Sequence, residues 1–179
     1  MSTKNKINDE VIIPENVKVE VDGFLIKVKG PSGENEKRLG HQRIYLVKED
    51  NKIIISSKRQ SRNEKKLIRT FKAHITNLIN GTINPYIYKL KICSGHFPMS
   101  VSLSNNKLII KNFFAEKIPR VANILPKTEV KINGDEITIE GVDKEAVGQT
   151  ASNIEQACRI TNRDRRIFMD GIYIISKTK

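Results

Sequence analysis

The stretch Ile13-Pro14-Glu15-Asn16-Val17 has a weaker copy, Phe97-Pro98-Met99-Ser100-Val101, further along the chain. Two more pairs of segments align at the spacing from Pro14 to Pro98: FLIK at 24–27 with LIIK at 108–111, and KIII at 52–55 with EITI at 136–139. Short apolar strands resemble one another readily, so one match would carry little weight. Three matches in one order at one spacing indicate a tandem duplication.

Each half contains the same series of expected elements: strand, turn, strand, connection, strand, turn, strand and helix. Residues 17–21 alternate between apolar and polar, as a half-buried strand does. Asp22-Gly23 then forms a hairpin turn into residues 24–29. The sequence therefore predicts an α+β fold of two tandem duplicated domains, each an antiparallel β-sheet packed against one main α-helix.

The two helices carry recognisable end signals. Ser61 and Glu64 have the spacing of a capping box, so the first helix is expected to begin at Ser61. Gly81 is expected to end it as a left-handed cap. The second helix is expected to begin at Asp143. Its expected buried face consists of Val147, Ala151, Ile154 and Cys158.

These elements divide the chain into three expected parts. A polar, flexible N-terminus occupies 1–8, the first α+β domain occupies 9–82, and the second occupies 83–179. Residues 86–94 and 172–175 are apolar enough to add strands to the second domain.

The composition favours a polyanionic partner. The chain of 179 residues has a net charge of +12, from 32 Lys and Arg against 20 Asp and Glu. Such a surplus attracts phosphate polymers. No stretch approaches the roughly 18 apolar residues of a spanning helix, and neither a signal peptide nor a prenylation box is present. We therefore expect a cytoplasmic protein with no membrane partner. Aromatic residues make up only 6%, so base stacking is not expected to dominate.

The densest positive charge lies in the run QACRITNRDRRIFMDGIYIISK at 156–177. Its candidate nucleic-acid-binding residues are Arg159, Arg163, Arg165, Arg166, Phe168, Gly171 and Lys177. The cations would neutralise phosphates, and Gly171 would let the backbone approach the RNA closely. Phe168 either anchors the turn in the core or stacks on a base. The alternative for one or two of the arginines is a solvated helix end that complements the helix dipole.

The first helix carries a second basic cluster, opposed only by Glu64. Its members are Lys58, Arg59, Arg62, Lys65, Lys66, Arg69 and Lys72. A soluble helix normally mixes charges of both signs, so RNA or an acidic protein partner is expected here, with an ordinary polar face as the alternative. Arg62, Lys65 and Arg69 are the candidate RNA-binding residues.

No motif supports catalysis, a metal or a cofactor. Cys93-x-x-His96 lacks a second ligand pair of suitable spacing. The carboxylate pairs fall in expected turns and helix ends. Gly30-Pro31-Ser32-Gly33 is neither a Walker loop nor a dinucleotide fingerprint, and is expected to be a tight turn. The protein is therefore predicted not to be an enzyme.

The C-terminal run resembles the signature of the universal large-subunit ribosomal protein family called L-six in bacteria and L-nine in eukaryotes, in its archaeal and eukaryotic form. The matching positions are Gln156, Ile160, Arg163, Arg166, Phe168, Asp170, Gly171, Ile172, Tyr173, Ile174 and Lys177. Segments 13–17, 28–33, 94–98 and 112–117 also resemble the family. Ala115 departs from it, because the family usually has glycine there.

The resemblance implies a structural constituent of the large ribosomal subunit that binds large-subunit rRNA near the factor-binding region at the stalk base. Implied neighbours are other large-subunit ribosomal proteins, stalk-base proteins and translation GTPases. The second domain would make much of the rRNA contact, and a eukaryotic member would pass through the nucleolus during assembly. Two alternatives remain open: a free-standing basic RNA-binding or RNA-processing protein, and a basic module that docks acidic protein partners.

Overall fold

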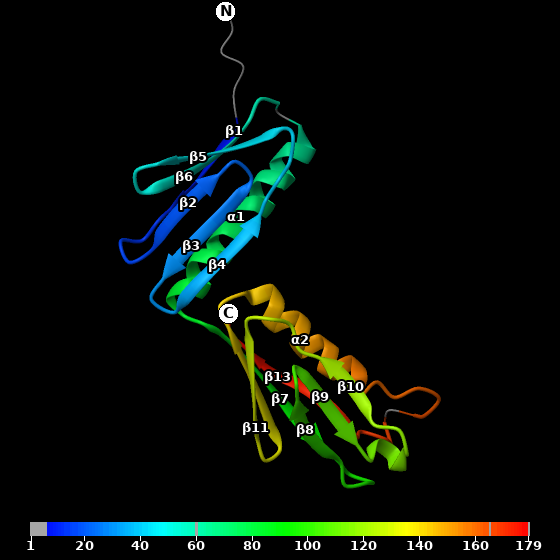
Figure 1. Cartoon of the computed structure of the whole chain (residues 1–179). Helices are drawn as coiled ribbons and strands as arrows, with labels where there is room; N and C mark the ends of the chain where they lie inside the picture. The colour runs from blue at the N-terminus through cyan, green and yellow to red at the C-terminus, as the bar shows by residue number, and fades with distance from the viewer. Residues whose placement is uncertain (1–6, 60, 165, 179) are drawn as a thin grey trace, which may run out of the picture. The chain divides into compact units, whose positions relative to one another are not determined.

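The computed structural model describes residues 7–59, 61–164 and 166–178. The chain divides into two compact units, Met1–Pro85 and Tyr86–Lys179. Each unit combines antiparallel strands with one long helix (Figure 1). Residues 1–6, expected to belong to a flexible terminus, and Arg165, a candidate RNA-binding residue, lie outside the described residues.

The first unit contains two three-stranded sheets, in the orders β1-β6-β5 and β2-β3-β4. Its elements are β1 (Ile7–Ile12), β2 (Lys18–Asp22), β3 (Leu25–Gly30), β4 (Gly33–Arg38), β5 (Ile44–Glu49), β6 (Lys52–Ser57) and α1 (Arg62–Ile83). In strands β3 and β6 buried residues alternate with half-buried or exposed ones, and α1 presents a helical stripe that includes Ile68 and Ile75. These apolar faces meet in one core, where each fully buried isoleucine contributes about 1.5–3 kcal/mol.

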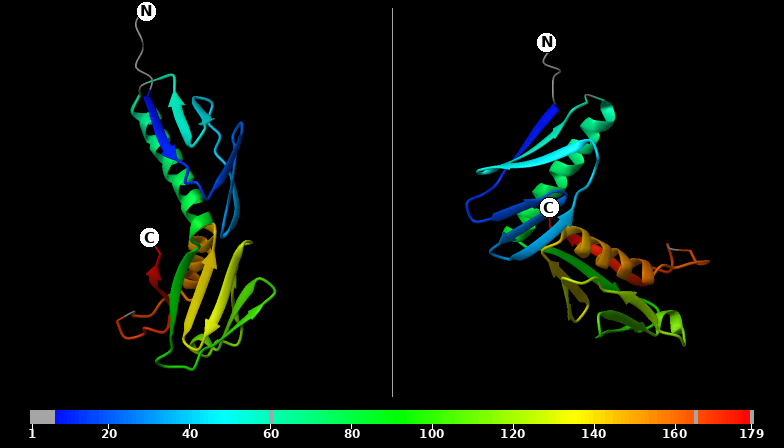
Figure 2. Two further views of the ribbon diagram at one scale, coloured as in Figure 1. Left: turned by 90° about the vertical axis from the view of Figure 1, so that its left-hand side faces the viewer. Right: turned by 45° about the horizontal axis from the view of Figure 1, so that its top comes forward.

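The second unit repeats this plan and extends it. Its sheets have the orders β10-β9-β8 and β11-β12-β7-β13. The elements are β7 (Tyr86–Cys93), β8 (Ser100–Ser104), β9 (Lys107–Lys111), the 3-10 helix η1 (Phe113–Ala115), β10 (Arg120–Asn123), β11 (Thr128–Asn133), β12 (Glu136–Gly141), α2 (Lys144–Ala157) and β13 (Gly171–Lys177). Each helix runs along the strands of its own unit (Figure 2).

The predicted α+β duplication is confirmed. The sheet β1-β6-β5 of the first unit corresponds to β7-β12-β11 of the second, and β2-β3-β4 corresponds to β8-β9-β10. The difference from the prediction is that each helix accompanies two sheets and not one. Strands β1, β4 and β10 were not predicted. Strand β4 reads GENEKR and contains no apolar residue, so its pairing with β3 is what makes it a strand.

Both predicted helix starts are confirmed, whereas the predicted end of the first helix is wrong. Ser61 and Asp143 are the N-caps of α1 and α2. Gly81 is buried inside α1, which continues to Ile83. Asn84 is extended because the Pro85 ring disfavours helical backbone in the residue before it. The proline of the connection therefore ends the helix, and Gly81 lies inside it.

The expectation for residues 7 and 8 was wrong, and the expectation for the GPSG segment is confirmed. Ile7 and Asn8, assigned to the flexible terminus, pair with Ser57 and Ser56 in β1. The GPSG segment is the tight turn expected, because Gly30 pairs with Gly33 at the end of the β3–β4 hairpin. Within the described parts of the chain, no helix is both long and apolar enough to cross a membrane.

Candidate nucleic-acid interface

The candidate interface is the loop of residues 158–170, here called the arginine loop, which joins α2 to β13. Helix α2 ends where the Cys158 amide donates to the Glu155 carbonyl, with 3.2 Å between N and O. Further along, the amides of Ile167 and Phe168 both donate to the Asp164 carbonyl, at 3.1 and 2.9 Å. These bonds form a tight turn at 164–168, and Arg159, Arg163 and Arg166 are exposed on the loop.

A buried carboxylate fixes the base of the loop. Asp170 accepts hydrogen bonds from the amides of Gly95 and His96, the latter at 2.9 Å, and its other oxygen lies 2.6 Å from His96 Nδ1. Burial favours a higher pKa for Asp170, but the bonds from His96 and Gly95 outweigh it, so the pKa lies below its ordinary value. The ionised carboxylate therefore ties the loop to the segment that comes after β7.

Three aromatic rings support the loop: the partly buried Phe114 and Phe168 rings and the exposed His96 ring. The Phe168 ring lies 4.9 Å from the His96 ring and 5.8 Å from the Phe114 ring, measured between centroids. The Arg163 guanidinium lies over the rings of Phe114 and Phe168, 4.7 and 5.0 Å from their centroids. Such cation–π contacts hold a guanidinium in place without neutralising it. The structure thus places the partly buried Phe168 ring against the core of the unit, and its contact with RNA stays a prediction.

Arg120, on β10, secures the start of the loop, and its role was not predicted from the sequence. Its guanidinium makes a bidentate pair with Glu116, at 2.8 and 2.6 Å, which raises the pKa of Arg120 and lowers that of Glu116. It also donates to the carbonyls of Ala157 and Arg159, at 3.0 and 3.1 Å. The only signal in the sequence was its position four residues after Glu116.

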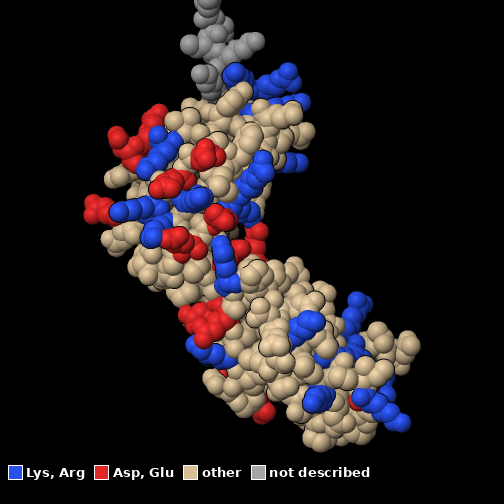
Figure 3. Space-filling model, in the orientation of Figure 1, with Lys and Arg blue, Asp and Glu red and all other residues tan. Residues whose placement is uncertain are grey.

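The predicted cations do not all gather in one place. Arg159, Arg163 and Arg166 are exposed on the arginine loop, and Arg166 pairs with Asp164 at 2.8 Å. Lys177 lies at the other end of β13, about 20 Å from Gly171 at the usual rise of a strand. Figure 3 shows Lys and Arg side chains grouped at the end of the second unit that holds η1 and the loop.

Gly171 lies against the side chain of Tyr173. It is buried, and a Cβ atom there would lie 3.2 Å from the Tyr173 ring. The Tyr173 hydroxyl in turn donates to the Asp170 carbonyl at 3.4 Å. The φ of +155° and the crowding by the Tyr173 ring both favour glycine at this position, and its close approach to RNA stays a prediction. Ile167 and Met169, which are 63% and 65% exposed beside the arginines, were not predicted.

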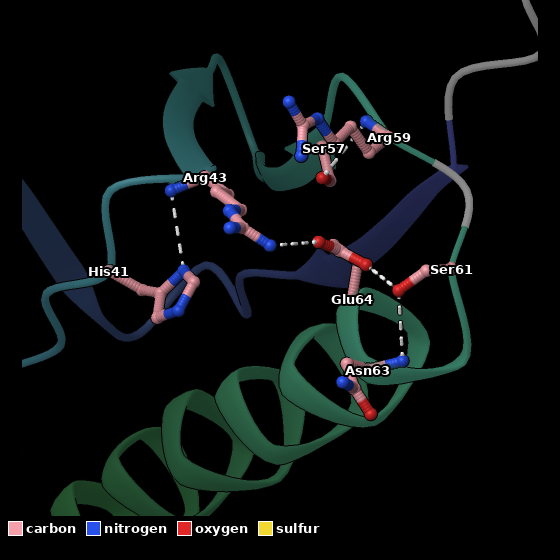
Figure 4. A network of polar contacts seen from close by, with 7 residues as sticks. All are labelled: His41, Arg43, Ser57, Arg59, Ser61, Asn63 and Glu64. Atoms are coloured by element: carbon pink, nitrogen blue, oxygen red, sulfur yellow. Dashed lines mark hydrogen bonds and ion pairs between the residues drawn. The ribbon is translucent and has the colours of Figure 1, made fainter.

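The first unit carries the other predicted cations on α1. Arg62, Lys65 and Arg69 are exposed, and their spacing places them along one side of the helix. Glu64, the acid that lies within this cluster in the sequence, is 1% exposed and points into the unit (Figure 4). It accepts a bond from the Ser61 hydroxyl and pairs with Arg43 at 3.2 Å.

The Ser61 bond is the largest cause that lowers the pKa of Glu64, to about 2, and Arg43 adds to it. Since this carboxylate is engaged inside the unit, it does not compensate the exposed cations Arg62, Lys65 and Arg69, whereas Lys72 of the same helix pairs with Asp9 at 2.6 Å. Elsewhere, burial raises the pKa of the Cys158 thiol to about 11, so this thiol is protonated at neutral pH. Among the described residues, no three His, Cys, Asp or Glu side chains gather closely enough to hold a metal ion.

Comparison with known proteins gives matches along nearly the whole chain. A family model described as Ribosomal protein L6 matches residues 13–83 and 97–171. This chain is also similar to proteins called large ribosomal subunit protein uL6. It is 48% identical to the one from Desulfurococcus amylolyticus, over 96% of this chain and 95% of the relative. The relative from Ignicoccus hospitalis is 46% identical over 93% of this chain and 92% of its own length. The relative from Methanobrevibacter smithii is 40% identical over 96% of each chain.

Proposed function

Because the chain belongs to the ribosomal protein L6 family, we propose that it is a structural constituent of the large ribosomal subunit that binds large-subunit rRNA through the arginine loop. The relatives that cover almost all of the chain carry the name of a large-subunit protein. The role is structural and not catalytic: the chain supplies fixed positive charge and a rigid scaffold, in the ribosomes of the cytoplasm.

The observation that carries the rRNA contact is the way the loop is held. Buried Asp170 clamps its base, the Phe168 ring fills its interior, and Arg163 is held over that ring. Cations fixed before binding lose little conformational entropy when they meet phosphates. Arg163 and Arg166 are exposed on this rigid support, so they are suited to neutralise the rRNA backbone and release its counterions.

The position in the subunit follows from the resemblance of the C-terminal motif. We place the protein near the factor-binding region at the stalk base, with other large-subunit and stalk-base proteins as neighbours and translation GTPases close by. The cations Arg62, Lys65 and Arg69 of α1 offer a second basic surface for rRNA or for one of these proteins. Arg159 extends the basic surface at the start of the loop, and Lys177 adds a separate contact at the far end of β13.

Incorporation into ribosomes tests the proposal. A tagged copy of the full chain should sediment with the large subunit after a moderate salt wash. The double change Arg163→Glu/Arg166→Glu should move the protein to the top of the gradient while the circular dichroism spectrum stays the same. The matched control is Lys89→Glu/Lys131→Glu, which makes the same change in charge on exposed strand residues of the same unit. Equal incorporation of both variants would refute the role of the loop.

A further inference from the structure

A hollow of about 890 Å³ opens on the first unit, between the connection at 39–43 and the start of α1. This volume is within the range of about 300–1,000 Å³ that is usual for small-ligand sites. Phe24 contributes an aromatic side chain that is 45% exposed. The Leu39 amide donates to the Phe24 carbonyl at 2.7 Å, and a Cβ atom on Gly40 would lie 3.3 Å from Phe24 Cγ. The backbone therefore packs against the ring and holds it in place.

The hollow has a surplus of positive charge. Arg38, Arg43 and Lys66 line it, and Glu64 is its only acidic lining residue. That carboxylate is buried and already bound by Ser61 and Arg43, as Figure 4 shows. In the part of the chain that the structure describes, no carboxylate forms an ion pair with Arg38 or Lys66. Two cations at the rim are thus available to an anion from outside.

The remaining polar groups of the lining suit the edge of a base. Gln42 and Asn63 both line the hollow and are exposed. A side-chain amide both donates and accepts, as the edges of unpaired bases require. An acidic peptide would require donors only, and would gain little from these two acceptors or from a flat ring. A base stacked on a ring, with phosphates at nearby cations, is the usual arrangement for single-stranded nucleic acid.

We propose that this hollow binds one unpaired nucleotide of a single-stranded RNA, with the base against Phe24 and the phosphates paired with Arg38 and Lys66. The site belongs to the first unit, shares no residue with the arginine loop and does not depend on the function proposed for that loop. It adds a stacking contact that the low aromatic content of the chain argued against.

The test uses the full chain with the changes Arg163→Glu/Arg166→Glu, so that binding by the loop does not mask the hollow. Fluorescence anisotropy measures the affinity for a short labelled oligouridylate. Adding Phe24→Leu should weaken binding by at least about 5-fold, because base–aromatic stacking contributes about 1–3 kcal/mol per base. Adding Phe24→Tyr, which keeps the ring, should leave the affinity within about 2-fold. Equal affinities of the leucine and tyrosine variants would overturn the proposal.

A second measurement compares two probes on the same chain, so its main result does not depend on how a Phe24 variant folds. An abasic oligonucleotide with the same number of phosphates should bind at least about 5-fold more weakly than oligouridylate. Its binding should also be insensitive to Phe24→Leu. Equal binding of the two probes would mean that only phosphates are recognised and would overturn the stacking contact. Tighter binding of a glutamate-rich peptide, sensitive to Phe24→Leu, would overturn RNA in favour of an acidic protein partner.

Discussion

The two units share one plan and differ in the segment that comes after the helix. In the first unit α1 ends just before Pro85, and the chain passes into β7 of the second unit. In the second unit α2 gives way to the arginine loop, and β13 returns to pair with β7. Strand β1 corresponds to β7, but among the described residues of the first unit β6 is its only partner. The loop and β13 are therefore additions to the duplicated unit.

Each unit also buries a carboxylate beside its basic surface, with a different result. Glu64 is engaged by Ser61 and Arg43 at the start of α1, so it strengthens a helix end. Asp170 is engaged by Gly95 and His96, which are 75 and 74 residues away in sequence, so it closes a loop. The comparison indicates that the duplicated plan supplies a stable scaffold and that the added segment required its own anchor.

Loss of the loop anchor should give the largest effect on stability. In Asp170→Ala the amides of Gly95 and His96 lose their charged acceptor, so the second unit should become less stable by about 2–3 kcal/mol. Urea unfolding measures the total loss of stability, and hydrogen exchange of the individual amides assigns that loss to one unit. The control Asp164→Ala, at an exposed position in the same loop, should cost about 1 kcal/mol or less. A loss shared equally by the two units would contradict the anchor.

The two helix caps should differ by a smaller amount. Ser61 accepts from the Asn63 amide at 3.2 Å, and Asp143 accepts from the Glu145 amide at 3.0 Å. Changing either cap to alanine should cost about 1 kcal/mol. Ser61→Ala should cost more than Asp143→Ala, because it also removes the hydrogen bond to buried Glu64. Urea midpoints of the two variants measure the difference, and a larger loss for Asp143→Ala would show that the Glu64 network adds nothing.

The smallest expected effect is a difference in acid sensitivity. The pKa of Glu64 is about 2 in the folded chain, against an ordinary 4.5. A depressed pKa stabilises the fold above the ordinary value, and this stabilisation is lost as the pH falls from about 4.5 towards about 2. Thermal melts of Glu64→Gln should therefore show a weaker dependence on pH over this interval than melts of the unaltered chain. Identical dependence in both would exclude Glu64 as a source of acid sensitivity.

Local signals in the sequence predicted the frame of each unit. The capping residues Ser61 and Asp143 act within one helical turn, and alternation along β3 reports a half-buried strand, so neighbouring residues were sufficient. Strand β4 was not predicted because it has no apolar residues that could alternate with its polar ones. The predicted end of the first helix at Gly81 was wrong because a buried glycine inside a helix has the same local sequence signature as a glycine at a helix end.

The sequence predicted which residues make up the candidate site, but it did not predict the contacts that hold them in place. The arginines and Phe168 stand together in the sequence, so their proximity required no knowledge of the fold. The Asp170 clamp and the Arg120 bridge join segments that are distant in sequence and meet only once the sheets have formed. The crowding of Gly171 by the Tyr173 ring was not predictable either, because a glycine in the sequence shows nothing of what lies beside it.

The central claim is that the added arginine loop makes phosphate contacts with rRNA. Its most direct test is the salt dependence of binding between the full chain and a large-subunit rRNA fragment. The slope of log affinity against log salt should become less steep by roughly 0.7 to 0.9 for each contact that Arg163→Glu/Arg166→Glu removes. Lys89→Glu/Lys131→Glu should leave the slope unchanged. Equal slopes for the unaltered chain and the loop variant would contradict the claim.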